Sequence, residues 1–474
     1  MAQVQLRFLG GAGNVTGSRF LLETDGTRLL VDCGLYQERE LLGRNWEPFA
    51  VPPDSIDAVL LTHAHLDHSG YLPMLVRDGF RGRIYGTAAT IETAEILLKD
   101  AGRIAEEDAA KKRRRHEREG RRGPHPEIPL YTARDAQRVM PFFSEVDYRH
   151  PAKVTRHIQA EYRDAGHILG AASVLVTVRG RRGRRGGAGP VSVLFSGDIG
   201  RAARPLLHDP DPFTRADYVV VESTYGDRSH EDPDVAGELA RIVNETAERG
   251  GNLVIPSFAV GRAQELLFHL KQLTEAGRIP RLLTFVDSPM ATSVTSLCRR
   301  HLDLLDPEFA REFRGRRSAF DFPGLNFVRS VEESKAINQI HGTSIIIAGS
   351  GMCTGGRIKH HLIANIRRPE STVLFVGYQA GGTLGRRIQR GDDPVRILGH
   401  NHEVAARIEV LNGLSAHGDR EDMLEWLGAL KQPPRRVFVV HGEAASSAAF
   451  ARSIEERFGW SVSMPAFGDE VGLD

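Results

Sequence analysis

The chain has little cysteine, no long apolar run and no excess of charge of one sign. Its three cysteines, Cys33, Cys298 and Cys353, are widely spaced and form no CxxC pair, which argues against a disulfide framework and a thiolate zinc site. No run of about 18 apolar residues is present, so no membrane span is expected. The N-terminal residues lack the apolar core of a signal peptide. We therefore expect a cytoplasmic protein.

Charge is balanced overall but clustered locally, with 62 Lys and Arg against 61 Asp and Glu. Segments 111–122 ("KKRRRHEREGRR") and 179–185 ("RGRRGRR") are strongly basic. Such runs can bind phosphate backbones, whereas a solvated helix end and a solvated loop are the alternatives. Neither segment contains Phe, Tyr or Trp, so neither offers a surface for base stacking.

The length of 474 residues exceeds one ordinary core, so two or three domains are expected. Up to about residue 226 the pattern is mostly strands and turns, with a hairpin at Asp25-Gly26, a long helix over 90–119 and a short helix near 132–143. From about residue 230, helices alternate with short apolar strands. This alternation is typical of a doubly wound α/β domain with a parallel sheet.

Five apolar, strand-like runs end abruptly in a side chain that can bind a metal or move a proton. The five residues are Asp32, His63, Asp198, Glu222 and His441. Functional sites in α/β proteins lie beyond the carboxyl ends of strands, where loops converge. We therefore predict one site assembled from distant parts of the chain.

The stretch "THAHLDHSG" (62–70) places three histidines and one aspartate within six positions. His63 and His65 can face one side of an extended segment. Asp67 and His68 follow at a turn and can face a second location about 3.5–4 Å away, as in two-metal hydrolases. A histidine-rich turn bonded to its own backbone is the alternative. Histidine and carboxylate ligands favour zinc.

Together with "LLVDCG", "DAGHILGAAS" and "FSGDIG", this stretch resembles the metallo-β-lactamase superfamily. The resemblance implies a four-layer αββα sandwich and two zinc ions per chain. His63, His65 and His167 would hold one zinc, and Asp67, His68 and His441 the other. Asp198 would bridge the two, and Asp32 would accept a hydrogen bond from a ligand histidine. A hydroxide between the metals would be the nucleophile.

Three further stretches, "VVESTYGDR", "GLSAHGD" and "VVHGE", resemble motifs A, B and C of the β-CASP nucleases, as do "IPSFAVGRAQELL" and "GSGMCTGGR". This implies an α/β β-CASP domain inserted as a cap, with metallo-β-lactamase parts at 1–226 and 401–474 around an insertion at 227–400. Proton transfer would fall to His417 paired with Glu222, although His417 alone could be a surface-loop histidine. A histidine at motif C, His441, is typical of the members that act on RNA.

The resemblance thus implies a zinc-dependent endoribonuclease, with 5′→3′ exonuclease activity as an addition, that acts on single-stranded RNA in RNA processing or decay. Alternatives are a dizinc hydrolase of small thioesters or lactams, a DNA-acting β-CASP nuclease, and a catalytically dead RNA-binding scaffold. No membrane partner is expected. The sequence does not choose between a monomer and a homodimer.

Several residues are weaker candidates. Ser415, Arg262 and Thr224 could contact phosphates, as could the glycines of "GSGMCTGG" (Gly351, Gly355 and Gly356), but each could equally shape a turn. The remaining clustered histidines lie outside the motifs, and we expect them on the surface: His116, His360, His361, His400 and His402. Cys33 is expected to be a small buried apolar residue.

Overall fold

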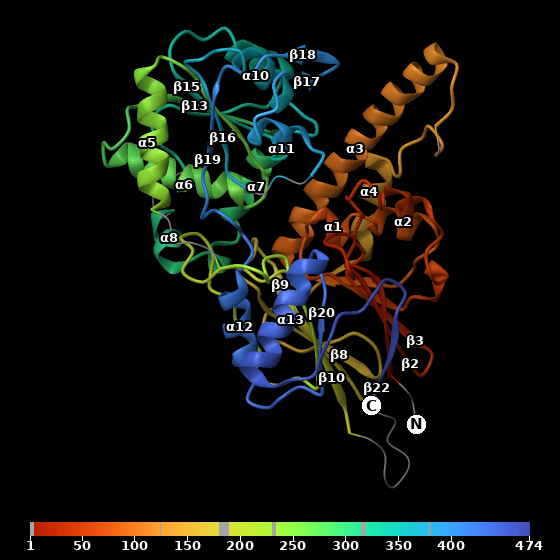
Figure 1. The fold of residues 1–474 in the computed structure, drawn as a ribbon. Coiled ribbons are helices and arrows are strands. Elements are labelled where there is room, and N and C mark those ends of the chain that lie inside the picture. The colour runs from red at the N-terminus through yellow and green to blue at the C-terminus, as the bar shows by residue number, and fades with distance from the viewer. Residues whose placement is uncertain are drawn as a thin grey trace. The chain divides into compact units, whose positions relative to one another are not determined.

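The chain forms two compact units, one made of residues 1–229 and 417–474 and the other of residues 230–416 (Figure 1). The computed structural model describes residues 4–123, 125–179, 189–229, 234–313, 319–377, 379 and 381–474. The basic segment 179–185 lies outside the described residues except for its first arginine. In sequence, the second unit is an insertion in the first. No helix in the described part of the chain has both the length and the apolar character needed to span a membrane.

The first unit contains two seven-stranded mixed sheets. In spatial order, the first sheet consists of β22 (Glu470–Leu473), β1 (Val4–Gly10), β2 (Arg19–Thr24), β3 (Thr27–Val31), β4 (Ala58–Leu60), β5 (Arg83–Gly86) and β6 (Phe143–Glu145). The second consists of β21 (Val462–Ser463), β20 (Arg436–Val439), β11 (Tyr218–Val221), β10 (Val191–Phe195), β9 (Ala172–Val178), β8 (Ile158–Asp164) and β7 (Ala152–Lys153). The predicted turn at Asp25-Gly26 joins β2 to β3, where Thr24 pairs with Thr27.

The two sheets pack face to face, and helices cover their outer faces. Alternate strand residues such as Val31 and Val220 belong to the core between the sheets. On the outer face of the second sheet, Val219 packs with Trp426 and Phe450 of the helices α12 (Arg420–Gly428) and α13 (Ala444–Phe458). The first sheet lies beside α1 (Leu66–Ser69), α2 (Leu72–Arg77), α3 (Ala88–Glu119) and α4 (Ala133–Val139). Four layers result, which confirms the predicted αββα sandwich.

Parallel pairing brings the polar strand endings together at one edge of each sheet. β3 pairs in parallel with β4, so Asp32 and His63 leave neighbouring strands in the same direction. β10, β11 and β20 are likewise consecutive parallel neighbours, so Asp198, Glu222 and His441 emerge side by side. Adjacent parallel strands necessarily end at the same edge, which is why five separate stretches of sequence can supply one site.

The second unit is an α/β domain with a parallel six-stranded sheet, as predicted. In spatial order the strands are β14 (Leu325–Phe327), β13 (Leu283–Asp287), β15 (Ser344–Ala348), β12 (Leu253–Pro256), β16 (Thr372–Phe375) and β19 (Arg407–Val410). The helices are α5 (Val235–Glu248), α6 (Arg262–Glu275), α7 (Pro289–Cys298), α8 (Pro307–Glu312), α9 (Val331–Ile337), α10 (Ile358–Asn365) and α11 (Leu384–Gln389). A small antiparallel pair, β17 (Val395–Ile397) and β18 (His400–His402), completes the unit.

Two histidines expected on the surface are buried, so the prediction was wrong for them. His361 is fully buried on α10 and its Nε2 lies 2.7 Å from Asp287 Oδ2. His116 is 3% exposed and forms an ion pair with Glu127. A carboxylate partner makes burial of each imidazole tolerable, and neither partner is near its histidine in sequence. The other three are more accessible, with His360 and His400 exposed and His402 half-buried.

Asp287 is the centre of a buried polar network in the second unit. Its carboxylate accepts hydrogen bonds from His361 and from the Ser334 hydroxyl (2.5 Å), and Arg357 donates to it at 2.6 Å. Burial raises the pKa of Asp287, but these hydrogen bonds outweigh burial and hold the pKa below its ordinary value. The network joins β13 to the start of α10.

Replacing Asp287 by alanine should destabilise the second unit by about 3–5 kcal/mol, because Arg357 and His361 lose their buried acceptor. The three tryptophans, Trp46, Trp426 and Trp460, all lie in the first unit. In urea, far-UV circular dichroism should therefore show an earlier transition that tryptophan fluorescence does not follow. Ser334→Ala removes one hydrogen bond and is the matched control, with an expected loss of about 1 kcal/mol. Equal stability of Asp287→Ala and the parent protein would contradict the role given to this network.

Candidate metal centre

Seven of the predicted site residues converge from five separate elements of the first unit. His63 follows β4, His65 precedes α1, and Asp67 and His68 lie within α1. His167 follows β8, Asp198 follows β10 and His441 follows β20. Their ligand atoms form close groups that could each hold a metal ion.

The first group consists of His63, His65 and His167 with Asp198. His65 Nδ1 lies 3.1 Å from His63 Nε2 and 3.2 Å from His167 Nε2. Asp198 Oδ2 lies 3.4 Å from His63 Nε2 and 3.5 Å from His167 Nε2. Three imidazole nitrogens and one carboxylate oxygen thus surround a single point.

The second group consists of Asp67, His68 and His441. The Nε2 atoms of His68 and His441 are 3.1 Å apart, and His441 Nε2 lies 3.6 Å from Asp67 Oδ2. Asp198 faces this group with its other oxygen, Oδ1, at 3.2 Å from His68 Nε2 and 3.6 Å from His441 Nε2. One carboxylate therefore lies between the two groups and offers one oxygen to each.

Protonation differs between the two groups. Burial lowers the pKa of His63 and of His167, and it lowers that of His65 to about 3, with neighbouring imidazoles acting in the same direction. These rings are therefore neutral, with lone pairs available for coordination. In the second group, carboxylates outweigh burial and raise the pKa of His68 and of His441. The carboxylates of that group thus create a negative local potential, which favours a bound cation.

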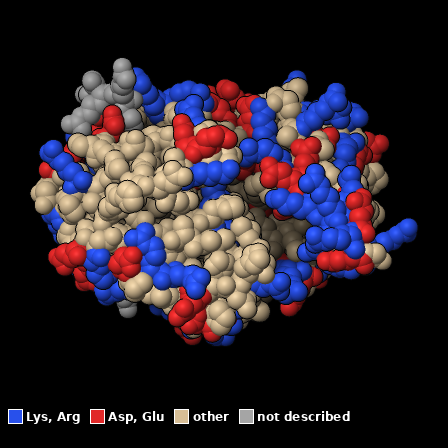
Figure 2. Space-filling model, turned by 90° about the horizontal axis from the view of Figure 1, so that it is seen from above, with Lys and Arg blue, Asp and Glu red and all other residues tan. Residues whose placement is uncertain are grey.

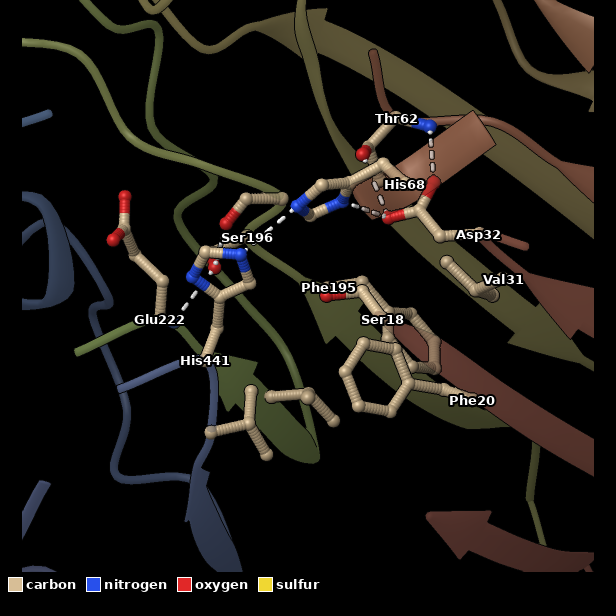
Figure 3. A pocket seen from close by; sticks show the side chains of 13 residues that line it. Ser18, Phe20, Val31, Asp32, Thr62, His68, Phe195, Ser196, Glu222 and His441 are labelled. Atoms are coloured by element: carbon tan, nitrogen blue, oxygen red, sulfur yellow. Dashed lines mark hydrogen bonds and ion pairs between the residues drawn. The ribbon is translucent and has the colours of Figure 1, made fainter. Parts of the chain in front are cut away.

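Asp32 fixes the orientation of two of these rings. Its Oδ2 accepts hydrogen bonds from His68 Nδ1 at 2.7 Å and from the Thr62 hydroxyl at 2.8 Å, while Oδ1 accepts from the Thr62 amide. The Thr62 hydroxyl also lies 3.1 Å from His63 Nδ1. Figure 3 shows Asp32 and Thr62 on one side of His68 and His441 on the other. Because His68 Nδ1 donates to Asp32, its Nε2 is the nitrogen that faces the second group.

Sequence reasoning missed Thr62, although it directly precedes His63 at the end of an apolar run. A hydroxyl at that position is buried and needs a partner, which is a signal in itself. Beside His68, a small cavity is lined by polar site residues, including Asp32 and Glu222, and by apolar side chains of both sheets, including Phe20, Val31 and Phe195. The hydrogen bond between Asp32 and His68 thus lies against the core, where a low dielectric strengthens it.

The backbone around the site is tight and in places strained. Asp32 and His441 adopt positive φ angles of 58° and 50°, a conformation that is uncommon for non-glycine residues. A Cβ at Gly34 would lie 1.6 Å from the carbonyl oxygen of Asp67. Only glycine lets the segment after Asp32 approach α1 closely enough to align Asp67 and His68.

Glu222 and His417 form a separate pair at the edge of the first group. Glu222 accepts from the amide of Ile199 at 2.6 Å, and both of its oxygens lie 3.1 Å from His417 Nδ1. His417 Nε2 faces Asp198 Oδ2 at 3.8 Å. Burial lowers the pKa of His417, but Glu222 and Asp198 outweigh it and raise the pKa to about 9. At neutral pH His417 therefore carries a proton beside the metal groups.

The weaker candidates do not form one set. The Thr224 hydroxyl lies 3.2 Å from His441 Nδ1 and orients that ring. Arg262 begins α6 in the second unit, and its guanidinium donates to the Val376 carbonyl at the end of β16. Ser415 also belongs to the second unit. Gly351, Gly355 and Gly356 lie in the loop between β15 and α10, where Gly351 packs under the ring of Phe258.

The donor set fits zinc. Five imidazoles and two carboxylates face one another with their nitrogen and oxygen atoms 3.1–3.6 Å apart. Within the described part of the chain, no hydrogen-bond donor serves the buried Oδ1 of Asp198. Nitrogen and oxygen acceptor atoms packed this closely repel one another unless cations lie among them. Histidine nitrogen together with carboxylate oxygen is a donor set that zinc prefers.

Three family models match the chain. The metallo-β-lactamase superfamily matches residues 13–139, the Beta-Casp domain matches residues 263–388, and the Zn-dependent metallo-hydrolase RNA specificity domain matches residues 401–465. The first model covers "THAHLDHSG", and the third covers His417 and His441. The second lies wholly within the second unit.

Curated relatives match along the whole chain. A ribonuclease of Thermus thermophilus is 37% identical over 463 residues, which cover 98% of each chain. The transcription termination factor FttA of Methanosarcina mazei is 31% identical over 467 residues, covering 96% of this chain and 69% of the factor. A crystal structure of a protein of unknown function from Enterococcus faecalis matches at a TM-score of 0.55 with 13% identity and full coverage of both chains, which shows a shared fold alone.

Replacing Asp32 by asparagine should weaken Zn²⁺ binding about 10- to 100-fold, because an amide cannot hold the His68 and Thr62 hydrogen bonds as a carboxylate does. Competition with a chromogenic chelator measures this. Asp78→Asn, at an exposed carboxylate of the same unit, is the control and should bind zinc like the parent. Equal zinc affinity in Asp32→Asn and Asp78→Asn would show that Asp32 does not support the centre.

Proposed function

Because the chain belongs to the β-CASP ribonuclease family of the metallo-β-lactamase superfamily, we propose that it is a zinc-dependent ribonuclease that hydrolyses RNA phosphodiester bonds. The main support for this proposal is the position of Asp198, because its two carboxylate oxygens face two different groups of ligand atoms. A ribonuclease and several termination factors among the relatives support RNA as the substrate and RNA processing or transcription termination as the setting.

Two zinc ions per chain would be held by the two groups. His63, His65 and His167 would bind one, Asp67, His68 and His441 the other, and Asp198 both. When bound, such ions lower the pKa of water and stabilise charge on an attacked phosphoryl group. The protein's own contribution is to hold the ligands: Asp32 orients His68 directly and His63 through Thr62, and Thr224 orients His441.

His417 would act as the general acid. Hydrolysis of a phosphodiester must place a proton on the departing sugar oxygen. Glu222 holds the Nδ1 side of the ring, so the proton on Nε2 points toward the metal groups. The raised pKa of His417, about 9, keeps that proton in place at neutral pH. Removal of either member of the pair should slow the reaction without removing a metal ligand.

The finer features of the activity are part of the proposal. The enzyme would cut single-stranded RNA internally and would also degrade it from the 5′ end. Roles of Ser415 and Arg262 in phosphate binding remain predictions, as do the cytoplasmic location and the domain boundaries near residues 226 and 400, and the choice between a monomer and a homodimer stays open. Thr224 is better explained by its contact with His441 than by contact with substrate.

The proposal predicts cleavage of RNA but not of single-stranded DNA of equal length and sequence. Zinc-loaded enzyme is incubated with each strand, labelled in turn at the 5′ and the 3′ end, and products are sized on a gel. His417→Asn and Glu222→Gln should each slow cleavage about 10²- to 10⁴-fold with unchanged zinc content. His400→Asn, at an exposed histidine, is the matched control and should cut like the parent.

Other outcomes would identify the alternatives. Equal cleavage of DNA would favour a DNA-acting member of the family. Hydrolysis of small thioesters or lactams without any cleavage of RNA would favour the small-molecule hydrolase. Zinc binding and RNA binding without hydrolysis of any of these substrates would indicate a scaffold. Each of these results contradicts the proposed ribonuclease.

A further inference from the structure

The end of α3 and the three residues that follow it form a basic arm on the first unit. Residues 111–122 carry eight Lys and Arg against two Glu, and all except Lys112 and His116 are exposed. Figure 1 shows α3 extending beyond α1, α2 and α4. Figure 2 shows Lys and Arg side chains, with Asp and Glu among them, at the right of its view.

One face of this arm is packed, so the arm is not a frayed helix end. His116 forms its ion pair with Glu127, and Arg113 donates to the Glu127 carbonyl at 3.0 Å. Gly123 lies against His116 and Lys112, and the ring of His125 stacks on Trp46 with centroids 5.4 Å apart. The returning segment thus holds the helix to its final residue, Glu119.

The opposite face presents a row of cations. Lys111, Arg114, Arg115 and Arg118 follow the spacing i, i+3, i+4 and i+7, which places them on one helix face. Lys111 lies near Glu107 and Asp108, at 3.8 and 3.7 Å. Among the described residues, no carboxylate forms an ion pair with Arg114, Arg115, Arg118 or Arg122. We call these four arginines the arginine stripe.

Stabilisation of α3 does not explain why the arginine stripe is present. Like charges at i and i+4 repel, as Arg114 and Arg118 do. The helix dipole favours cations only in the last turn, which includes Arg118 but not Arg114. The side chains that maintain the arm, His116 and Arg113, are on the packed face. Three unpaired guanidinium groups on a fixed helix, with that of Arg122 just beyond the helix end, therefore form a surface suited to an anionic partner.

We infer that the arginine stripe binds the phosphate backbone of the RNA substrate at a distance from the metal centre; this inference rests on the proposed function. RNA fits better than an acidic protein, because the exposed face over residues 111–122 has no large apolar or aromatic side chain to form an interface core. The absence of aromatic residues also means that bases are not stacked there. Binding should therefore be independent of sequence and sensitive to salt.

The length of α3 determines how long an RNA must be to contact both the metal centre and the arginine stripe. The hydroxyls of Thr87 and Thr90, at the start of α3, donate to the Gly170 carbonyl, three residues after His167. At 1.5 Å per residue, Arg114 lies about 36 Å further along the helix axis than Thr90. A stacked strand rises about 3.4 Å per nucleotide, so roughly ten nucleotides are needed to span that distance. A tetranucleotide would occupy the metal centre only.

The test compares the parent with a variant in which Arg114, Arg115, Arg118 and Arg122 are all glutamine. Affinity for a 5′-labelled RNA of about 40 nucleotides, long enough to span both places, is measured at several salt concentrations in the His417→Asn background, which retains the metal ligands. The glutamine variant should bind about tenfold more weakly near 0.1 M salt. Its plot of log affinity against log salt should be shallower by about 0.7 for each phosphate that is no longer neutralised.

Two variants control for charge and for position. Lysine at the same four positions keeps the charge and should restore both the affinity and the salt slope. Glutamine at Arg435, Arg436, Arg452 and Arg457, four exposed arginines elsewhere on the same unit, removes equal charge and should leave the slope close to that of the parent. Circular dichroism of each variant should match the parent, because the packed face of α3 is not altered.

Cleavage assays separate this inference from the proposed function. The long RNA should be cut less efficiently by the glutamine variant, through a higher KM, whereas cleavage of a tetranucleotide should match the parent. An equal affinity and salt slope for the glutamine variant and its positional control would overturn the inference while leaving the ribonuclease intact. Failure of the parent to cut either RNA would overturn the ribonuclease itself.

Discussion

The Asp198 carboxylate is the contact on which the rest of the centre depends. It is 2% exposed, and each of its oxygens faces a different set of imidazole nitrogens. A buried carboxylate is costly without nearby cations. Two metal ions that share the carboxylate, as proposed above, would make the arrangement favourable, and its Oδ1 has no hydrogen-bond donor in the described part of the chain. In this proposal the two groups form one centre with a shared ligand.

The sandwich fold positions Asp198 beside the other site residues, because the strands that precede them end at the same edge of each sheet. β10, β11 and β20 are parallel neighbours and bring Asp198, Glu222 and His441 side by side, while β3 and β4 do the same for Asp32 and His63. Two of the non-glycine residues with positive φ angles, Asp32 and His441, lie here. The well-packed core between the sheets holds these conformations in place.

Much of the centre could be predicted from the sequence, because an apolar run that stops at an Asp or His is a strong local signal. The clustered histidines indicated a metal site, and the resemblance supplied His167 and the bridging role of Asp198. The neighbour relations of the strands could not be predicted, since β20 joins β11 across more than 200 residues of chain. The hydroxyl of Thr62 was missed because its importance arises only from its contacts with Asp32 and His63. Isolated histidines were a further weak point, since His361 and His116 are buried against carboxylates whose positions become visible only after folding.

The central claim is that Asp198 is shared by two zinc ions, and anomalous diffraction at the zinc edge from crystals of the zinc-loaded protein tests it most directly. The account predicts two peaks per chain about 3.5–4 Å apart, one among His63, His65 and His167 and the other among Asp67, His68 and His441, each within bonding distance of a different Asp198 oxygen. A single peak, or two peaks of which only one is bonded to Asp198, would contradict it.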